Sequence, residues 1–457
     1  MGASGSIVLQ GAEVIRRDGT VEGPCDIVIN SGVIQEVAGS ADRTYPQPTA
    51  ATAAGTKKPT DCEVVDCTGL FVSPGLVNLH THSPMTLFRG MAEDISIEDW
   101  FNVCIWPYES RLRPSDVRVG ALLAILEMVD AGVTAFFDHY FMAGEIVSAA
   151  AESGIRADIA PTVFGAGDWR KEISDAAALI ESVNAEGGPV RARMGPHSTY
   201  ICSPEVLRAC RDAAVSLGVG THIHMSETEK QVQESLAEHG KTPFQVAYDA
   251  GLMDTPAVFA HGAWMTGDEV KLVSRESFIA LAPKTYLKLA SGIENLYRIL
   301  DLTGYGLDQS PIKIGIGTDG AASSNTLSPL EQARLFALLG KDRAGDATAF
   351  TLKDVWKTLM RGHDALGAGT GDVAPGFQAD LVVWDLRFPD TWPATDPLAA
   401  IIYSASSRNV RDVLVQGRFV KRAGALTTLD AGEIMAEAAR VRDRLLIEGA
   451  GRAKVKY

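Results

Sequence analysis

Hydrophobic and polar positions follow two different patterns along the chain. Residues 6–37 alternate short β-rich runs with glycine-containing turns, and strand character resumes over residues 63–69. Between them, residues 40–61 are rich in Pro, Ala, Thr and Gly, which predicts a surface loop. The first part of the chain therefore predicts a small all-β unit with one long excursion.

From Pro74 the pattern changes to short apolar strands separated by amphipathic helical stretches, such as 114–131 and 204–217. The predicted strands lie at residues 76–79, 134–137, 156–160, 190–194, 220–224, 258–260, 278–282 and 312–317. Strands that alternate with helices predict βαβ units and a parallel sheet. About eight such units predict a closed (β/α)₈ barrel of the TIM type.

After a helical stretch at 352–366, β-rich runs return at 376–386 and 411–424, and a predicted helix at 431–447 follows. We expect strands from both chain ends to form one small β-sandwich beside the barrel. The predicted fold class is α/β, with residues 1–73 and 371–457 forming the two parts of the sandwich, the second including the C-terminal helix, and residues 74–370 forming the barrel.

The composition of the chain limits the classes of molecule that it is expected to bind. The chain has 457 residues, 46% hydrophobic and 22% charged, and a net charge of −15, which disfavours a nucleic-acid groove. No apolar run of transmembrane length occurs, and the first residues, MGASGS, lack the basic and apolar regions of a signal peptide. Six cysteines without CxxC pairs indicate reduced thiols. We expect a cytoplasmic protein with a small-molecule substrate and no nucleic-acid or membrane partner.

Histidines gather at the predicted strand ends. His80 and His82 directly follow a short strand, and residues two apart in a strand point to the same face, so both imidazoles can converge on one metal. Active sites of such barrels lie at the C-terminal ends of the strands. His224 ends another strand and is the better ligand candidate there, whereas His222 is either a support for the ligands or a core residue. His197 and His261 end two further strands.

Two carboxylates complete this set. Asp319 ends the strand IGIGTDG and is either a metal ligand or a cap of the following turn. Glu227 follows His224 by three residues and is either a proton shuttle or a solvated charge at the start of a helix. Three neutral imidazoles and one carboxylate suit Zn²⁺, with Fe²⁺ as the alternative, and leave one position open for a water that ionises near neutral pH. A free carboxylate nearby can move protons to the leaving group.

The ordered motifs PGLVNLHTH, THIHMSE, FAHG and IGTDG resemble those of the amidohydrolase superfamily, in its mononuclear cytosine/adenosine deaminase-like branch. The return of GFQADLVVWD resembles the split β-sandwich of the same enzymes. The resemblance implies hydrolytic deamination of a heterocycle with release of ammonia. It implies a metal held by His80, His82, His224 and Asp319. Glu227 would then protonate the ring nitrogen, His261 would lie beside the attacking hydroxide, and Asp319 would also accept the proton of the water.

A closer resemblance is to the S-adenosylhomocysteine/methylthioadenosine deaminases, through HTHSPMTLFRGMAEDISIEDW, WPYE and GPHSTYICSPE. It implies that Glu109 holds ribose hydroxyls, that His197 contacts the sugar or its substituent and that Trp100 walls the pocket. Glu109 as a solvated charge and Trp100 as a core residue are the competing interpretations. An adenosine-like nucleoside, of the adenosine, 5′-deoxyadenosine or methylthioadenosine type, is the favoured substrate.

The chain departs from this group's pattern at two places. Leu281 stands where the group has a histidine, and Thr285-Tyr286 stand where it has Ser-Asn. Pro161 replaces an arginine that grips the homocysteine carboxylate, and Arg170 falls near a second such arginine. S-adenosylhomocysteine is therefore less favoured than a neutral substrate.

Other functions compete with this prediction. A guanine- or pterin-type deaminase and a triazine hydrolase share the same branch, but dechlorinating members are expected to alter the acidic ligand or the glutamate, and both are present here. A non-catalytic, ligand-binding barrel would be expected to have lost a ligand. We also expect a homo-oligomer, a dimer or larger.

Overall fold

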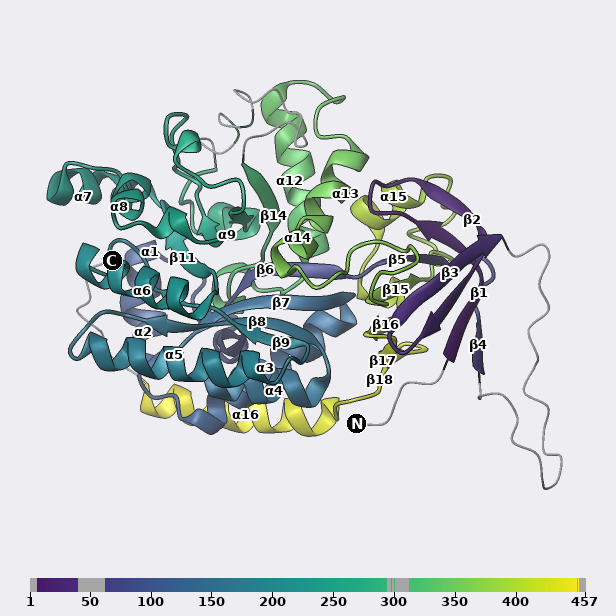
Figure 1. Cartoon of the computed structure of the whole chain (residues 1–457), viewed down its shortest axis with the longest axis horizontal. Coiled ribbons are helices and arrows are strands. Elements are labelled where there is room, and N and C mark those ends of the chain that lie inside the picture. The colour runs from purple at the N-terminus through teal and green to yellow at the C-terminus, as the bar shows by residue number, and fades with distance from the viewer. Residues whose placement is uncertain are drawn as a thin grey trace.

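A barrel of parallel strands wrapped by helices lies beside a smaller β-rich part in the computed structural model (Figure 1). The structure describes residues 6–39, 62–293, 297, 300, 312–449 and 451. The predicted loop at 40–61 lies outside the described residues.

The barrel is assembled from two parallel sheets that meet at both edges. Its strands are β6 (Leu76–Thr81), β7 (Val133–Tyr140), β8 (Arg156–Val163), β9 (Val190–Ala192), β10 (Gly195–Pro196), β11 (Thr221–Met225), β12 (Ala257–His261), β13 (Phe278–Leu281) and β14 (Lys313–Ile316). Parallel bridges join Met194 to Thr221 and Ser198 to His224 at one junction. At the other, the Thr318 amide donates to the His80 carbonyl at 2.9 Å. With β9 and β10 sharing one position, eight strand positions close the ring, as predicted.

Barrel strands such as β6 and β7 are buried on both faces and begin with mostly apolar runs. Every residue of β6 and β7 is buried, which is typical of parallel sheets covered by helices. A cluster from β6, β7, β12 and β13, which includes Leu79, Phe137 and Val258, fills the barrel interior. These residues precede His80, His139 and His261 in their strands, so the packed layer supports the C-terminal ends where polar side chains gather.

Helices surround the barrel (Figure 1). They are α1 (Ile97–Asp99), α2 (Trp106–Glu109), α3 (Pro114–Asp130), α4 (Ala143–Ser153), α5 (Trp169–Ala185), α6 (Pro204–Leu217), α7 (Glu229–His239), α8 (Pro243–Asp249), α9 (Pro283–Lys288), α11 (Ala321–Ser324), α12 (Pro329–Ala344), α13 (Leu352–Met360) and α14 (Gly362–Leu366). Short 3₁₀ turns η2 (Ser83–Phe88), η4 (Leu252–Asp254) and η5 (Glu269–Lys271) and the π-helical turn η3 (Trp100–Ile105) connect them.

Two predicted elements are divided in the structure. The helix predicted at 352–366 is separated into α13 and α14 at Arg361. The strand predicted at 190–194 becomes β9 and β10, because the chain changes partner between them: the Arg193 amide donates to Ile159, whereas the Met194 amide donates to Gly220 on the next strand.

The β-rich part draws strands from both chain ends into one sheet. Its order is β18 (Ala425–Leu426), β17 (Arg418–Arg422), β16 (Val410–Val415), β15 (Leu381–Trp384), β5 (Phe71–Pro74), β1 (Ser6–Ile15), β2 (Val21–Asn30) and β3 (Val33–Gly39), with β4 (Cys62–Asp66) also paired to β1. The antiparallel pair β5–β15 joins the two ends. Side chains from both halves, among them Ile29, Val72 and Leu414, share one core, so the single sheet curls around it.

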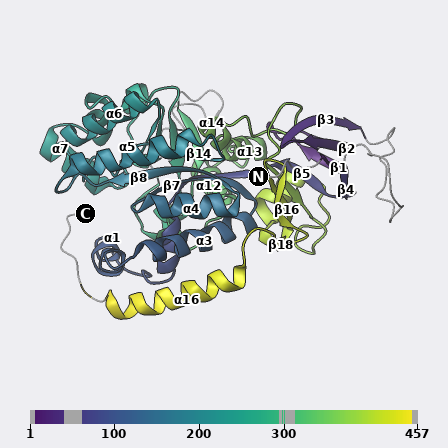
Figure 2. The same cartoon turned by 60° about the horizontal axis from the view of Figure 1, so that its bottom comes forward.

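Three short helical turns, α15 (Pro397–Ala399), η6 (Ala400–Ser404) and η7 (Ser407–Asn409), connect β15 to β16. Helix α16 (Ala431–Glu448) then returns along the outside of the barrel (Figure 2). It packs on α3, where Arg444 pairs with Asp116. The predicted domain boundaries after residues 73 and 370 stay a prediction. Among the described residues, no helix is long and apolar enough to cross a membrane.

Candidate metal centre and active site

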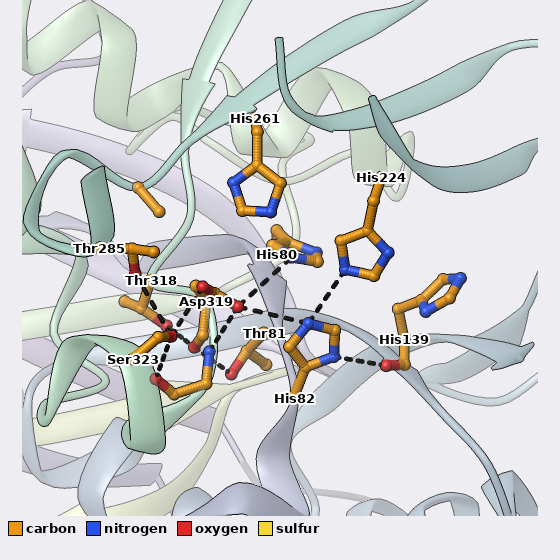
Figure 3. Close-up of polar contacts among 12 residues, drawn as sticks. His80, Thr81, His82, His139, His224, His261, Thr285, Thr318, Asp319 and Ser323 are labelled. Carbon is orange, nitrogen blue, oxygen red and sulfur yellow. Dashed lines mark hydrogen bonds and ion pairs between the residues drawn. The ribbon is translucent and has the colours of Figure 1, made fainter. Parts of the chain in front are cut away.

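Four side chains converge at the C-terminal ends of three barrel strands (Figure 3). His80 is the penultimate residue of β6, His82 follows that strand, His224 lies on β11 and Asp319 follows β14. His82 Nε2 lies 3.1 Å from His224 Nε2 and 3.3 Å from an Asp319 carboxylate oxygen, and His80 Nε2 lies 3.8 Å from the same oxygen. The structure thus brings together the four predicted ligands.

The outer ring nitrogens fix how these histidines point. His82 Nδ1 lies 2.6 Å from the His139 carbonyl and His224 Nδ1 lies 2.9 Å from the His197 carbonyl, so each carries a proton on Nδ1 and turns Nε2 toward the cluster. Two lone pairs facing each other at 3.1 Å repel unless a proton or a cation lies between them.

His80 Nε2 is buried and has no hydrogen-bond partner among the described residues. Imidazoles whose Nδ1 is engaged outside the site and whose Nε2 points to a shared centre are the arrangement of histidine metal ligands. Three such imidazoles and a carboxylate form a donor set suited to a divalent cation.

The pKa values of the clustered side chains also fit a site for a divalent cation. Burial disfavours a charged His82, but the hydrogen bond and charge of Asp319, together with the His139 carbonyl and the charge of Asp138, more than offset this and raise the pKa of His82 to about 9. Burial likewise opposes ionisation of Asp319, but the hydrogen bond and charge of His82 hold its pKa below the usual range. Burial lowers the pKa of His224 to about 3. A cation bound here would take the place of the proton on His82 Nε2, and would be held by three neutral imidazoles and one carboxylate.

Asp319 is held in an unusual backbone conformation. Its φ is +62°, in the left-handed region that non-glycine residues rarely adopt. The Gly320 amide donates to one carboxylate oxygen at 2.8 Å, and the Ser323 hydroxyl donates to the other at 2.7 Å. The Thr81 hydroxyl donates to the Asp319 carbonyl at 3.0 Å. These contacts over-determine the position of the carboxylate, which is how strained backbone persists at functional sites.

Glu227 and His261 lie beside the cluster. A Glu227 oxygen is 3.9 Å from His261 Nε2, and the Gln231 amide donates to its second oxygen at 3.4 Å. His261 also has left-handed backbone, with φ at +75°. Burial lowers the pKa of His261 to about 4, so the imidazole is neutral at pH 7. The pair therefore offers one carboxylate and one neutral imidazole next to the four-residue cluster.

A cavity opens from this cluster and contains all three predicted substrate contacts. Trp100, Glu109 and His197 line it together with His82, Glu227 and Asp319. Glu109 is buried and accepts a hydrogen bond from the Tyr140 hydroxyl, and burial raises the pKa of its carboxyl group. Trp100 donates its indole N–H to the Ala322 carbonyl at 3.3 Å and also belongs to the core. It is thus both a core residue and a cavity wall.

The same architecture occurs in known proteins. A family model described as the amidohydrolase family matches residues 71–420. The chain belongs to the amidohydrolase family. A 5-methylthioadenosine/S-adenosylhomocysteine deaminase of Pelotomaculum thermopropionicum is 35% identical over 447 residues, 96% of this chain and 99% of the relative. A 5′-deoxyadenosine deaminase of Methanothermobacter thermautotrophicus is 34% identical over 443 residues, 95% and 98% of the two chains.

Solved amidohydrolase structures agree. An adenosine deaminase from Xanthomonas campestris with bound zinc superimposes with a TM-score of 0.86 at 28% identity, over 96% of this chain and 98% of the other. An atrazine chlorohydrolase from Arthrobacter aurescens, also with zinc, gives a TM-score of 0.79 at 21% identity over 95% and 100% of the two chains, and shows the fold alone. The predictions of family, fold and hydrolytic activity on C–N bonds are thus confirmed.

Three residues that differ from the pattern of the S-adenosylhomocysteine/methylthioadenosine deaminases lie behind the site. Leu281, Thr285 and Tyr286 are fully buried and do not line the cavity. The Tyr286 ring packs 5.7 Å from that of His261, and Thr285 contacts Ser323, which in turn holds Asp319. Thr285 and Tyr286 therefore act on the site through the residues that they contact.

Pro161 and Arg170, the two positions that correspond to homocysteine-binding arginines, place no positive charge in the cavity. Pro161 is buried in β8. Arg170 is on the surface, where it pairs with Glu205 at 3.2 Å. No arginine or lysine occurs among the described residues that line the cavity.

Sequence reasoning missed His139, Tyr140 and Phe164, which line the cavity, and Ser323, which holds Asp319. His139 follows the predicted strand 134–137 by two residues, so the same strand-end pattern that marked the other histidines was present there. Phe164, one residue beyond β8, stacks on His197 at 5.3 Å between ring centroids. No pattern in the sequence marks Ser323.

Proposed function

We propose that this amidohydrolase is a metal-dependent deaminase of adenosine-like nucleosides, with 5′-deoxyadenosine and methylthioadenosine as the best substrates. The observation that carries the proposal is one cavity that joins a four-ligand cluster, a Glu227–His261 pair and the buried carboxylate of Glu109. The names of the relatives, which are deaminases of methylthioadenosine, S-adenosylhomocysteine and 5′-deoxyadenosine, support the same substrate class.

His80, His82, His224 and Asp319 would hold one divalent cation, and we propose zinc, with iron as the alternative. Zinc in solved relatives of the same fold supports this choice. A divalent cation in this position lowers the pKa of a bound water toward neutrality. Replacement of the ring amino group by the oxygen of that water releases ammonia.

The protein's own groups move the protons. Asp319 accepts the proton of the water, because its carboxylate is ionised and faces the cluster. Glu227, in its protonated form, gives its proton to the ring nitrogen next to the carbon under attack, which lets that carbon accept electrons from the incoming oxygen. The proton taken by Asp319 passes to the amino group, which leaves as ammonia, and the second proton of the water restores Glu227 as the carbonyl forms. His261, neutral and next to Glu227, orients the attacking oxygen with Nε2. Each role needs a group that is buried and fixed before the substrate arrives.

Glu109, His197 and Trp100 would bind the nucleoside away from the reacting carbon. The Glu109 carboxylate accepts hydrogen bonds from vicinal ribose hydroxyls, with the Tyr140 hydroxyl orienting it. Trp100 and the stacked pair of Phe164 and His197 offer ring faces to the substrate. With no lysine or arginine among the described lining residues, the charged homocysteine tail would lack a counter-ion.

Ammonia release by the zinc-loaded enzyme tests the proposal. The panel contains adenosine, 5′-deoxyadenosine, methylthioadenosine, S-adenosylhomocysteine, guanine, a pterin and an aminotriazine. We expect turnover of the nucleosides, with a higher kcat/KM for 5′-deoxyadenosine and methylthioadenosine than for S-adenosylhomocysteine. Turnover of guanine, the pterin or the triazine without turnover of any nucleoside would overturn the proposed substrate class but not the metal chemistry.

Two further properties belong to the proposal. All six cysteines are free thiols, which supports a reducing compartment such as the cytoplasm. A homo-oligomer is supported by exposed apolar side chains on α16, where Met435 is 60% and Ile447 is 82% exposed.

A further inference from the structure

His222 lies on β11, two residues before His224, and points at the back of another proposed ligand. Its Nε2 lies 2.9 Å from His80 Nδ1, and neither side chain is exposed to solvent. We propose that His222 is a positioning residue for the metal: it accepts the Nδ1 proton of His80 and thereby keeps His80 Nε2 turned toward the cluster. This inference rests on the proposed metal site.

Only one placement of protons on the rings of His80 and His222 is compatible with metal binding by His80. A histidine that binds a cation through Nε2 must carry its proton on Nδ1. His80 Nδ1 therefore donates, and His222 Nε2 accepts. A neutral His222 then carries its proton on Nδ1, which is buried without a partner among the described residues. Protonation of His222 on both nitrogens would place two N–H groups against each other and would break the contact with His80.

The surroundings hold His222 in place. The His222 amide donates to the Met194 carbonyl at 2.9 Å, and the ring packs 5.3 Å from that of His139. The acceptor for His80 is thus rigid before any cation binds.

His80 differs in this respect from the other two histidine ligands. His82 and His224 use backbone carbonyls, of His139 and His197, as partners for Nδ1. Of these three histidines, His80 alone has a side chain as its Nδ1 partner. A substitution of His222 therefore removes the group that orients His80, and it leaves the backbone and the four ligands unchanged.

Zinc affinity, measured by competition with a chromophoric chelator, tests the inference in His222→Leu. Loss of a hydrogen-bond partner of a ligating histidine typically weakens metal affinity about 10- to 100-fold, and we expect a loss in this range. His222→Gln offers a side-chain carbonyl to the His80 Nδ1 proton and is expected to recover most of the affinity. The matched control is His363→Leu, because His363 is an equally buried histidine whose partners, Thr370 and Gly75, lie outside the cluster.

A second readout is the absorption spectrum of the cobalt-substituted protein, which reports the ligand geometry without turnover. We expect it to change in His222→Leu and to return toward wild type in His222→Gln. Circular dichroism identifies variants that do not fold, and if the leucine variant is one of them, the glutamine variant and His222→Asn are compared instead. Zinc affinity within twofold of wild type in His222→Leu, or an equal loss in the His363→Leu control, would overturn the inference. A wild-type chain that binds no zinc would instead overturn the proposed metal site and the inference together.

Discussion

Asn78 and Thr318 are 240 residues apart in the sequence and are joined by two hydrogen bonds. The Asn78 side-chain Nδ2 donates to the Thr318 hydroxyl at 2.8 Å, and the Thr318 backbone amide donates to the Asn78 side-chain Oδ1 at 3.0 Å. The Thr318 hydroxyl then donates to the Asp319 carbonyl at 3.0 Å. Asn78 therefore links β6, which carries His80, to the strained residue that supplies the carboxylate of the cluster.

Replacement of Asn78 by alanine removes both bonds inside a fully buried part of the barrel. Each buried group left without a partner costs about 1–3 kcal/mol, so we expect the free energy of unfolding to fall by at least that amount. The measurement is the urea midpoint of the chain, followed by circular dichroism. Asn30→Ala, at an exposed position, serves as the control and should stay within about 0.5 kcal/mol of wild type. Equal midpoints for the two variants would mean that the Asn78 bridge does not stabilise the barrel.

Substitutions of Glu227 and Asp319 should cause two different defects, one in turnover and one in zinc binding. Glu227→Gln keeps the four ligating side chains and removes only the group that moves a proton, so bound zinc should stay at the wild-type level while kcat falls about 10²–10⁴-fold. Asp319→Ala removes a ligand, so zinc itself should be lost. The measurements are zinc content by mass spectrometry and ammonia release. Loss of zinc in Glu227→Gln would show that this glutamate is itself a ligand.

The Glu109 carboxylate should act on nucleoside binding, with an effect that depends on pH. Hydrogen bonds to a charged group contribute about 1.5–3 kcal/mol, so Glu109→Gln should lower kcat/KM on 5′-deoxyadenosine on the order of 10- to 100-fold, mainly through KM. Burial raises the pKa of this carboxyl group, so its charged form is lost as the pH falls. KM of the wild type should therefore rise toward acid pH and that of the variant should not.

Glu98→Gln is the matched control, because Glu98 is exposed on the neighbouring α1. We expect it to keep the wild-type KM at every pH. A KM unchanged by Glu109→Gln would remove Glu109 from the ribose site.

Most of the fold and the convergence of the four proposed ligands could be predicted, because both depend on short stretches of sequence. His80 and His82 follow an apolar strand directly, and IGIGTDG places Asp319 at a strand end without any knowledge of its neighbours. His139 carries the same strand-end signal, two residues beyond the apolar run that stops at Phe137, and could have been found in the same way. The Asn78–Thr318 bridge and the contact of Ser323 with Asp319 depend on which strands and loops meet when the barrel closes, and no local pattern predicts them.

His363 should make the stability of the protein sensitive to acid, independently of the metal site. It is buried beneath the barrel, where Nε2 donates to the Gly75 carbonyl at 2.8 Å and Nδ1 accepts from the Thr370 hydroxyl at 2.8 Å. These two bonds suit the neutral ring. Burial lowers the pKa of His363 from 6.5 to about 4 in the folded protein.

Between these two values the unfolded chain binds a proton at this residue and the folded chain does not. The free energy of unfolding therefore falls as the pH drops from about 6.5 to about 4, by about 3 kcal/mol from this residue. His363→Gln, which cannot be protonated, should lower the urea midpoint at neutral pH but show a shallower decline of the midpoint toward pH 4.5. His239→Gln, on the surface helix α7, should keep the wild-type slope. Parallel slopes for wild type and His363→Gln would show that His363 is protonated equally in the folded and unfolded chains.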